Sequence, residues 1–130
     1  MVAINFTVFI DKIRNGTKKQ TIRKWNSDRV KQMRDKKILQ LYTGMRTKEC
    51  KLLEEVELEE ILQLLIKPND QWLFDLEIYY YLKHKWVTLS PEDELELIKL
   101  DGFENRDSFF NWFNKRYNLK TDLFAVIRWK

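Results

Sequence analysis

The stretch "GTKKQTIRK", residues 16–24, joins one of only three glycines to a dense group of basic side chains. Gly16 permits the left-handed backbone that ends a short helix. Lys18 then lies in a loop, and alternation places Thr21 and Arg23 on one face of the strand that follows. Two cations around one hydroxyl group suit an anionic or carbonyl-bearing ligand. A strand edge kept soluble by its charges is the alternative that this spacing leaves open.

Length and composition indicate one folded domain, residues 1–130. The chain is 44% hydrophobic and 14% aromatic, and its 130 residues are enough to bury a single core. No apolar run approaches the roughly 20 residues of a membrane span, and the first residues lack the pattern of a signal peptide. We therefore expect an intracellular, cytoplasmic protein. One cysteine, Cys50, and one histidine, His84, predict no internal disulfide and no zinc site, so we expect neither metal nor cofactor.

Charge is distributed unevenly along the chain. Residues 1–51 hold 14 basic and 4 acidic side chains, whereas residues 52–130 hold 10 basic and 16 acidic ones. An excess of this kind favours an anionic partner for one face, and nucleic acid is the usual candidate. Mutual neutralisation of the two halves after folding is the alternative.

Periodicity and turn signals predict an α+β domain with a small mixed or barrel-like sheet. We expect strands over residues 4–9, 20–25, 37–44 and 123–129. We expect a short helix that ends before Gly16 and a basic helix over 27–37. Residues 49–66 should form a strand and then a short helix, and residues 67–86 should contain an aromatic strand or hairpin. Two further helices have clear start signals, Ser90 with Pro91 and then Asn105. The second carries an apolar stripe formed by Phe109, Trp112, Phe113 and Tyr117, and we assign the first three of these to the core. The apolar run at 123–129 is not typical of an exposed edge strand.

The pattern G-x-K-x-x-T-x-R, formed by Gly16, Lys18, Thr21 and Arg23, resembles the signature of the ASCH domains, which are relatives of the PUA RNA-binding fold. Three further landmarks agree in order: "KILQLYTG" (37–44), "DGF" (101–103) followed by "FFNWF", and the closing "FAVIRW" (124–129). The resemblance covers roughly residues 3–66 and 92–129. It leaves an aromatic-rich insertion at about 67–91.

This resemblance implies a PUA-like small β-barrel with helices packed over a cleft, lined by the signature residues. It implies binding of RNA or of a modified nucleoside, with no membrane partner. In some small bacterial ASCH proteins a lysine, a threonine and an acid remove the acetyl group from N4-acetylcytidine. The catalytic residues carried over to this chain are Lys18, Thr21 and Asp101, although those hydrolases have glutamate in place of Asp101. A ribonuclease is the third interpretation.

The chemistry of such a triad is coherent. Thr21 becomes a nucleophile when a base removes its proton, and burial beside Arg23 would lower the pKa of Lys18 toward that role. Asp101 would position the lysine or protonate the leaving amine. A binding-only cleft remains the alternative, in which Asp101 is simply the end of a helix.

The predicted ligand-binding set extends beyond the triad. In the signature strand and its loop it comprises Lys18, Lys19, Thr21, Arg23 and Trp25. In the insertion, alternation places Tyr79, Tyr81 and Lys83 opposite the face that contains Trp72 and Phe74, so these three are the candidates for stacking on bases and holding phosphates. Extension of the core and self-association through the insertion are the alternatives.

Overall fold

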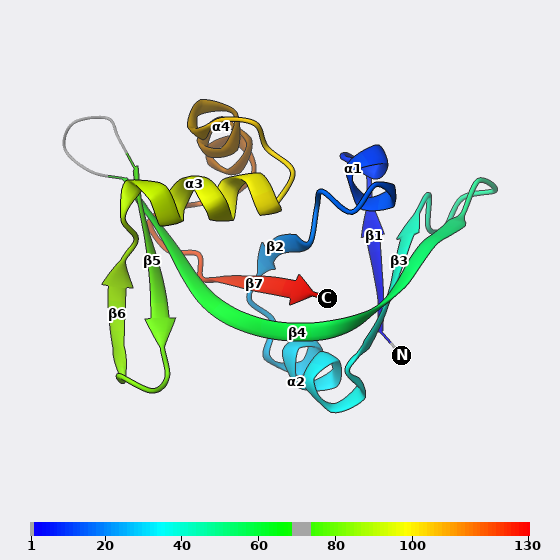
Figure 1. Cartoon of the computed structure of the whole chain (residues 1–130), viewed down its shortest axis with the longest axis horizontal. Coiled ribbons are helices and arrows are strands. Elements are labelled where there is room, and N and C mark those ends of the chain that lie inside the picture. Colours follow the sequence, from blue (N-terminus) through cyan, green and yellow to red (C-terminus); the bar gives the residue numbers. More distant parts are fainter. Residues whose placement is uncertain (1, 69–73) are drawn as a thin grey trace.

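The computed structural model describes residues 2–68 and 74–130. In these residues the order of elements is β1 (Val2–Phe6), α1 (Ile10–Arg14), β2 (Gln20–Lys24), α2 (Ser27–Lys36), β3 (Ile38–Thr43), β4 (Lys51–Pro68), β5 (Phe74–Tyr80), β6 (Lys85–Thr88), α3 (Pro91–Leu100), α4 (Arg106–Arg116) and β7 (Phe124–Trp129) (Figure 1). The predicted α+β class is confirmed. Trp72 lies outside the described residues. None of the described helices has the length and apolar character needed to cross a membrane.

The strands form one mixed sheet organised by the long strand β4. β1 pairs in parallel with β3, and β3, β4, β5 and β6 follow in antiparallel order. β7 pairs with both β4 and β2. Figure 1 shows β4 as a curved ribbon with β1 and β3 at one end and the β5–β6 hairpin at the other. The sheet is not closed into the predicted barrel, because β1 and β2 share no backbone pairing among the described residues.

The prediction of a strand followed by a helix within residues 49–66 is wrong. β4 is one strand of 18 residues, and its register against β7 shifts between Leu58 and Glu60, where an extra residue enters. Beyond that bulge, Ile61 belongs to one buried cluster while Leu62 packs against the other. An extra residue, combined with apolar side chains on both faces, imitates the spacing of a helix.

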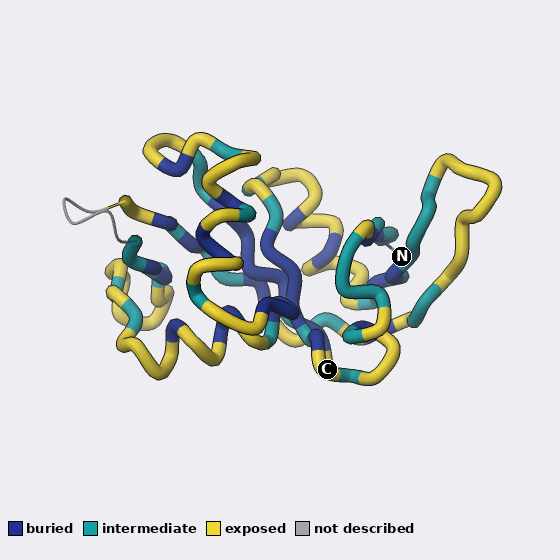
Figure 2. The backbone as a smooth tube through the Cα atoms, turned by 90° about the horizontal axis from the view of Figure 1, so that it is seen from above, coloured by how far each residue is buried: buried dark blue, intermediate teal, exposed yellow. Residues whose placement is uncertain are grey.

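β7 lies in the middle of the sheet, as its apolar sequence predicted. Phe124 and Val126 belong to the cluster covered by α3 and α4, whereas Ala125, Ile127 and Trp129 belong to the cluster covered by α1 and α2. Figure 2 accordingly shows the buried backbone concentrated in the middle of the molecule and the exposed backbone toward both ends. One strand therefore joins two cores.

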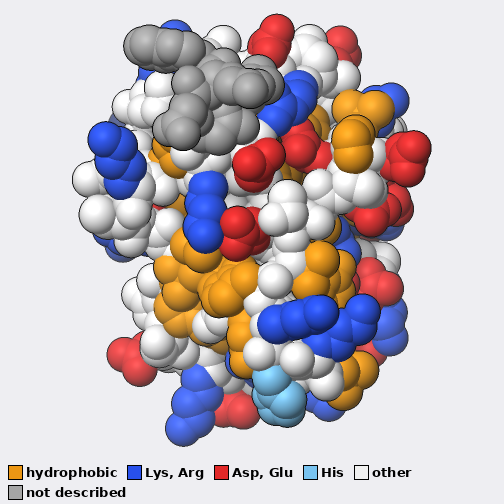
Figure 3. All heavy atoms as spheres, turned by 90° about the vertical axis from the view of Figure 1, so that its left-hand side faces the viewer, with side chains coloured by type: hydrophobic (Ala, Val, Ile, Leu, Met, Phe, Trp, Pro, Cys, Tyr) orange, Lys and Arg blue, Asp and Glu red, His pale blue; other side chains and the backbone are white. Residues whose placement is uncertain are grey.

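The segment of residues 74–88 forms the predicted aromatic hairpin, β5–β6. Leu76 and Ile78 of β5 are buried, so one face of the hairpin extends the first core. At its tip the side chains are exposed: 45% for Tyr81 and 99% for Leu82. Figure 3 shows hydrophobic side chains gathered on this end of the molecule.

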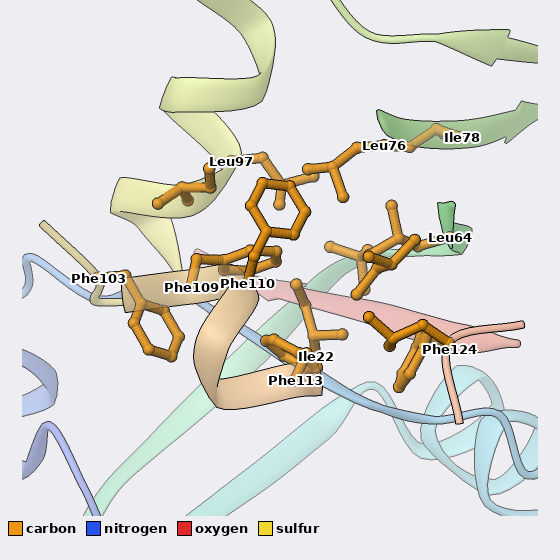
Figure 4. Close-up of a cluster of buried hydrophobic side chains, with 14 residues drawn as sticks. Ile22, Leu64, Leu76, Ile78, Leu97, Phe103, Phe109, Phe110, Phe113 and Phe124 are labelled. Atoms are coloured by element: carbon orange, nitrogen blue, oxygen red, sulfur yellow. The ribbon is translucent and has the colours of Figure 1, made fainter. Parts of the chain in front are cut away.

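The helices α3 and α4 pack over the sheet as their sequence signals predicted. Ser90 and Asn105 cap them by accepting hydrogen bonds from backbone N–H groups three residues further on. Phe109 and Phe113 point toward the sheet, where the ring of Phe113 meets that of Phe124 edge-on at 5.7 Å (Figure 4). This packing fixes the C-terminal end of α3 next to β2, and that junction forms the candidate site.

Candidate functional site

The loop between α1 and β2 places Lys18 inside the protein. Gly16 has φ +80°, which ends α1 as predicted. The backbone N–H of Lys18 then donates to the carbonyl oxygen of Lys12 over 2.9 Å, so the chain turns back toward α1. The Lys18 side chain is 3% exposed as a result.

Groups of the α1–β2 loop and of Gln20 in β2 donate to carbonyl oxygens at the end of α3. The backbone N–H of Lys19 donates to Leu100 over 3.1 Å, and the side-chain amide of Gln20 donates to Leu97 over 3.2 Å. Lys18 Nζ donates to the carbonyl oxygen of Asp101. The last carbonyls of a helix lack partners within it, and the negative end of the helix dipole attracts cations. Lys18 and Lys19 therefore help to hold the end of α3 in place.

Lys18 and Asp101 form a buried pair, 3.7 Å from Nζ to Oδ1, and Asp101 is only 4% exposed. Nε2 of Gln20 donates to the same carboxyl oxygen over 3.4 Å. Burial lowers the pKa of Lys18, although Asp101 opposes that shift. Burial likewise raises the pKa of Asp101, against the opposing charge of Lys18. Burial therefore disfavours the charged form of each group, and the attraction between the two opposite charges works against that effect.

Thr21 and Arg23 extend from β2 next to this pair. Nε of Arg23 donates to Oγ1 of Thr21 over 3.1 Å, which leaves the threonine hydroxyl proton free to donate elsewhere. Nη2 of Arg23 reaches across to the carbonyl oxygen of Asn5 in β1, 2.7 Å away, and the guanidinium lies 5.0 Å from the ring centre of Phe6. Arg23 therefore bridges the unpaired edges of β1 and β2.

These side chains line one cavity of about 210 Å³. Four predicted residues, Lys18, Thr21, Arg23 and Asp101, contribute to its wall. Aromatic rings and one further cation complete much of the remainder: Phe6, Phe9, Phe103, Trp112, Tyr117 and Arg116. Asp101 is the one acidic side chain in its described lining, so the cavity offers three cations, one buried acid and several ring faces.

Other predicted residues lie outside this cavity lining. Lys19 is half-buried, and its backbone rather than its side chain bonds to its neighbours. Trp25 packs against the core cluster beneath α2, and its Nε1 donates to the Ser27 hydroxyl over 3.3 Å. Tyr79, Tyr81 and Lys83 belong to the β5–β6 hairpin and its turn.

The hairpin residues form an aromatic group of their own. The rings of Tyr79 and Tyr81 meet edge-on at 5.1 Å, and Trp86 lies 5.5 Å from Tyr79 across the strand pair. The guanidinium of Arg34 in α2 lies 5.9 Å from the centre of the Tyr81 ring. Lys83 is exposed at the tip. An exposed group of rings next to cations resembles the surfaces that stack on unpaired bases.

Several residues of the site were missed at the level of sequence. Gln20 is fully buried and holds Asp101, and Asn5 supplies the carbonyl that receives Arg23. Trp112, assigned to the core, is half-buried and lines the cavity, with the guanidinium of Arg116 3.3 Å from its ring centre. The i, i+4 spacing of Trp112 and Arg116 was the signal available for that contact.

No family model, curated protein or solved structure matches the chain. The described residues also contain no group of three or more His, Cys, Asp or Glu side chains that could hold a metal ion.

Proposed function

We propose that this chain is an ASCH-type, PUA-like domain whose cavity binds RNA through a single nucleoside, or binds a modified nucleoside. One observation carries the proposal. Lys18, Thr21 and Arg23 come together with Asp101, 83 residues from Lys18, around one cavity walled by aromatic rings. In this proposal the PUA-like relationship concerns the arrangement of elements around the cavity, since the sheet itself is open.

The size and chemistry of the cavity favour a nucleoside. Its volume of about 210 Å³ is below the roughly 300–1,000 Å³ of pockets for drug-sized ligands, so it suits one base and part of its sugar. Rings such as Trp112 and Tyr117 could stack on a base, a contact worth about 1–3 kcal/mol. The Thr21 hydroxyl and the Asp101 carboxyl offer donors and acceptors for the polar edge of that base.

The binding proposal is tested by titrating the four ribonucleosides and N4-acetylcytidine into ¹⁵N-labelled protein. We expect the indole N–H signal of Trp112 to shift and that of Trp25, outside the cavity lining, to stay in place. Lys18→Met should weaken binding at least about tenfold, since it removes a buried donor. Lys19→Met is the matched control and should bind normally. Equal losses in both variants, or unchanged spectra with every nucleoside, would refute the proposal.

Amidohydrolysis is a second candidate function, favoured by the buried Lys18–Asp101 pair beside Thr21. In this scheme Oγ1 of Thr21 attacks the acetyl carbonyl of N4-acetylcytidine and its proton passes to neutral Lys18. The C–N bond breaks, and the nitrogen leaves as the amine of cytidine with a proton from Asp101 or protonated Lys18. Water then hydrolyses the threonine ester and releases acetate. The hydrogen bonds of Lys18 run to Asp101 in the structure, so substrate would have to bring Lys18 and Thr21 into contact.

A proton NMR time course of N4-acetylcytidine with the protein separates catalysis from binding. Hydrolysis predicts a growing acetate methyl signal that Thr21→Ala abolishes and Thr17→Ala, a change at an exposed threonine, leaves intact. If the NMR signals of the nucleoside shift but no acetate appears, the protein binds N4-acetylcytidine without hydrolysing it, and only the binding proposal remains. Labelled RNA that stays intact in the same mixture would rule out the ribonuclease interpretation for that RNA.

For longer RNA we propose the hairpin group as an additional contact. Tyr79 and Tyr81 provide ring faces, and Lys83 and Arg34 provide cations nearby. Tyr81→Ala should weaken binding of single-stranded RNA without changing nucleoside affinity, and the slope of log affinity against log salt should be about −0.7 per phosphate contact. A size that grows with protein concentration in sedimentation, and that Leu82→Ser abolishes, would instead assign the hairpin to self-association.

A further inference from the structure

A slot lies along the unpaired edge of β1, and two arginines reach across it, Arg23 from β2 and Arg29 from α2. Nη2 of Arg23 donates to the carbonyl oxygen of Asn5, and Nη2 of Arg29 in α2 donates to that of Ala3 over 2.8 Å. The two acceptors are alternate residues of β1, so both carbonyls point to the same side of the strand. The slot is therefore bridged by guanidinium groups where a barrel would have backbone pairing.

Arg23 and Asn5 divide this slot into two cavities. The first is the candidate site, and the second, of about 220 Å³, lies toward α2. Both cavities include Arg23 and Asn5 in their lining. The two spaces are thus neighbours separated by one side-chain bridge.

The second cavity has an apolar wall and a basic rim. Its apolar wall is formed by Ile4, Val30, Met33, Ala125 and Ile127. The charged residues in its described lining are Arg23, Lys24 and Arg29, and all are cations. A flat apolar ring carrying a negative charge at its edge would complement both features.

The rim cations keep hydrogen-bonding capacity for a ligand. A guanidinium has five N–H donors, and the bonds described above use two from Arg23 and one from Arg29. Lys24 forms an ion pair with Asp122 at 3.4 Å, but its side chain is 63% exposed, so this pair is weak. Phosphate oxygens could therefore be held at the boundary of the two cavities.

We infer that the second cavity is a subsite for the neighbouring nucleotide of the same RNA strand. The base of that nucleotide rests on the apolar wall, and the phosphate that links the two nucleosides lies against Arg23 and Arg29. The site then recognises a dinucleotide step rather than an isolated nucleoside. This inference rests on the proposed nucleoside binding in the first cavity.

The test compares the affinity of cytidine with that of dinucleotides in which the same nucleoside is linked through its 3′ or its 5′ phosphate. We expect one of the dinucleotides to bind at least about tenfold more tightly than the nucleoside. Arg29→Gln should remove much of that gain while leaving the nucleoside affinity unchanged, and Lys24→Gln, at the exposed part of the rim, should remove a smaller part of it. Lys31→Gln, the same charge change at an exposed position of α2 outside the cavity lining, should preserve the gain.

Each outcome separates this inference from the function on which it rests. If the nucleoside binds but neither dinucleotide binds more tightly, the subsite is refuted and the nucleoside site stands. If Lys31→Gln removes as much of the gain as Arg29→Gln, the gain is general charge attraction and the subsite is refuted. If neither nucleoside nor dinucleotide binds, both proposals fall. Thermal unfolding of every variant identifies losses of affinity that come from misfolding. Because the Lys24 side chain is largely exposed, we expect Lys24→Gln to fold normally.

Discussion

Lys18 and Asp101, separated by 83 positions in the chain, form an ion pair that is almost completely buried, with 3.7 Å between Nζ and Oδ1. A buried pair of this kind contributes little net stability, because desolvation of the two charges offsets their attraction. Removing one member is costly, since the other stays buried without its partner. The pair is therefore a sensitive position for testing both the fold and the chemistry of the cavity.

The first prediction concerns the loss of the acid. Asp101→Asn should lower the free energy of unfolding by about 3 kcal/mol, because Lys18 loses its counter-charge in a buried position. Chemical denaturation at neutral pH measures this effect. Asp35→Asn, at an exposed position of α2, is the control and should change stability little. Equal stability of the two variants would mean that Lys18 and Asp101 are not coupled in the folded protein.

The second prediction concerns the pKa of Lys18, which burial lowers from the ordinary value of 10.5. The unfolded chain therefore binds more protons at this group between the two pKa values, and its contribution to stability rises with pH across that window. Side-chain ¹³Cε and ¹⁵Nζ NMR spectra should show that Lys18 loses its proton at a lower pH than the other lysines do. In Asp101→Asn that group should titrate at still lower pH, because an attractive charge has gone. A Lys18 signal that titrates with the exposed lysines would contradict the assignment.

The third prediction concerns the carboxyl group, whose pKa burial raises from 3.8. Above pH 3.8 the unfolded chain loses this proton before the folded protein does, so the group contributes less stability as pH rises through the folded pKa. Differences in unfolding free energy between wild type and Asp101→Asn, measured from pH 3 to 7, report this contribution together with any change in the titration of Lys18, which the lysine NMR spectra follow separately. The wild-type advantage should shrink as pH rises from about 3.8. An advantage that grows over that range would mean that the carboxyl pKa is lowered.

The fourth prediction concerns two glycines with positive φ. An added Cβ at Gly102 would lie 2.8 Å from Cδ2 of Phe9, whereas at Gly16 the nearest atoms belong to the flexible Lys19 side chain at 3.9 Å. Gly16→Ala should cost only the backbone strain, about 1–2 kcal/mol. Gly102→Ala should cost clearly more and displace Phe9 from the cavity wall. Thermal unfolding measures the costs, and similar values for the two variants would show that Phe9 has room to move.

Local signals in the sequence predicted most of the elements. Ser90 and Asn105 begin helices, Gly16 ends one, and the apolar run of β7 lies in the middle of the sheet. The signature spacing also predicted that Lys18, Thr21 and Arg23 would approach one another, because loop geometry and strand alternation are local properties. The position of Asp101 came from the family resemblance.

What could not be predicted depended on contacts between distant segments. The bulge before Glu60 depends on pairing with β7, so β4 looked helical from its own residues. Gln20 gave no signal of its role, since its partners Leu97 and Asp101 lie far along the chain. The open slot beside β1 depends on two arginine side chains that occupy the place of a backbone ladder.

The central position of β7 has a consequence for biosynthesis. β7 is the last of the described strands to be translated, yet it is the strand that β2 pairs with and that supplies side chains to both cores. Before β7 is translated, β2 and one edge of β4 have no strand to pair with, and the apolar faces that pack against β7 are exposed. The sheet can be completed only after translation of Trp129, so this domain should fold late, and a nascent chain stalled before β7 should be sensitive to proteases and recognised by chaperones.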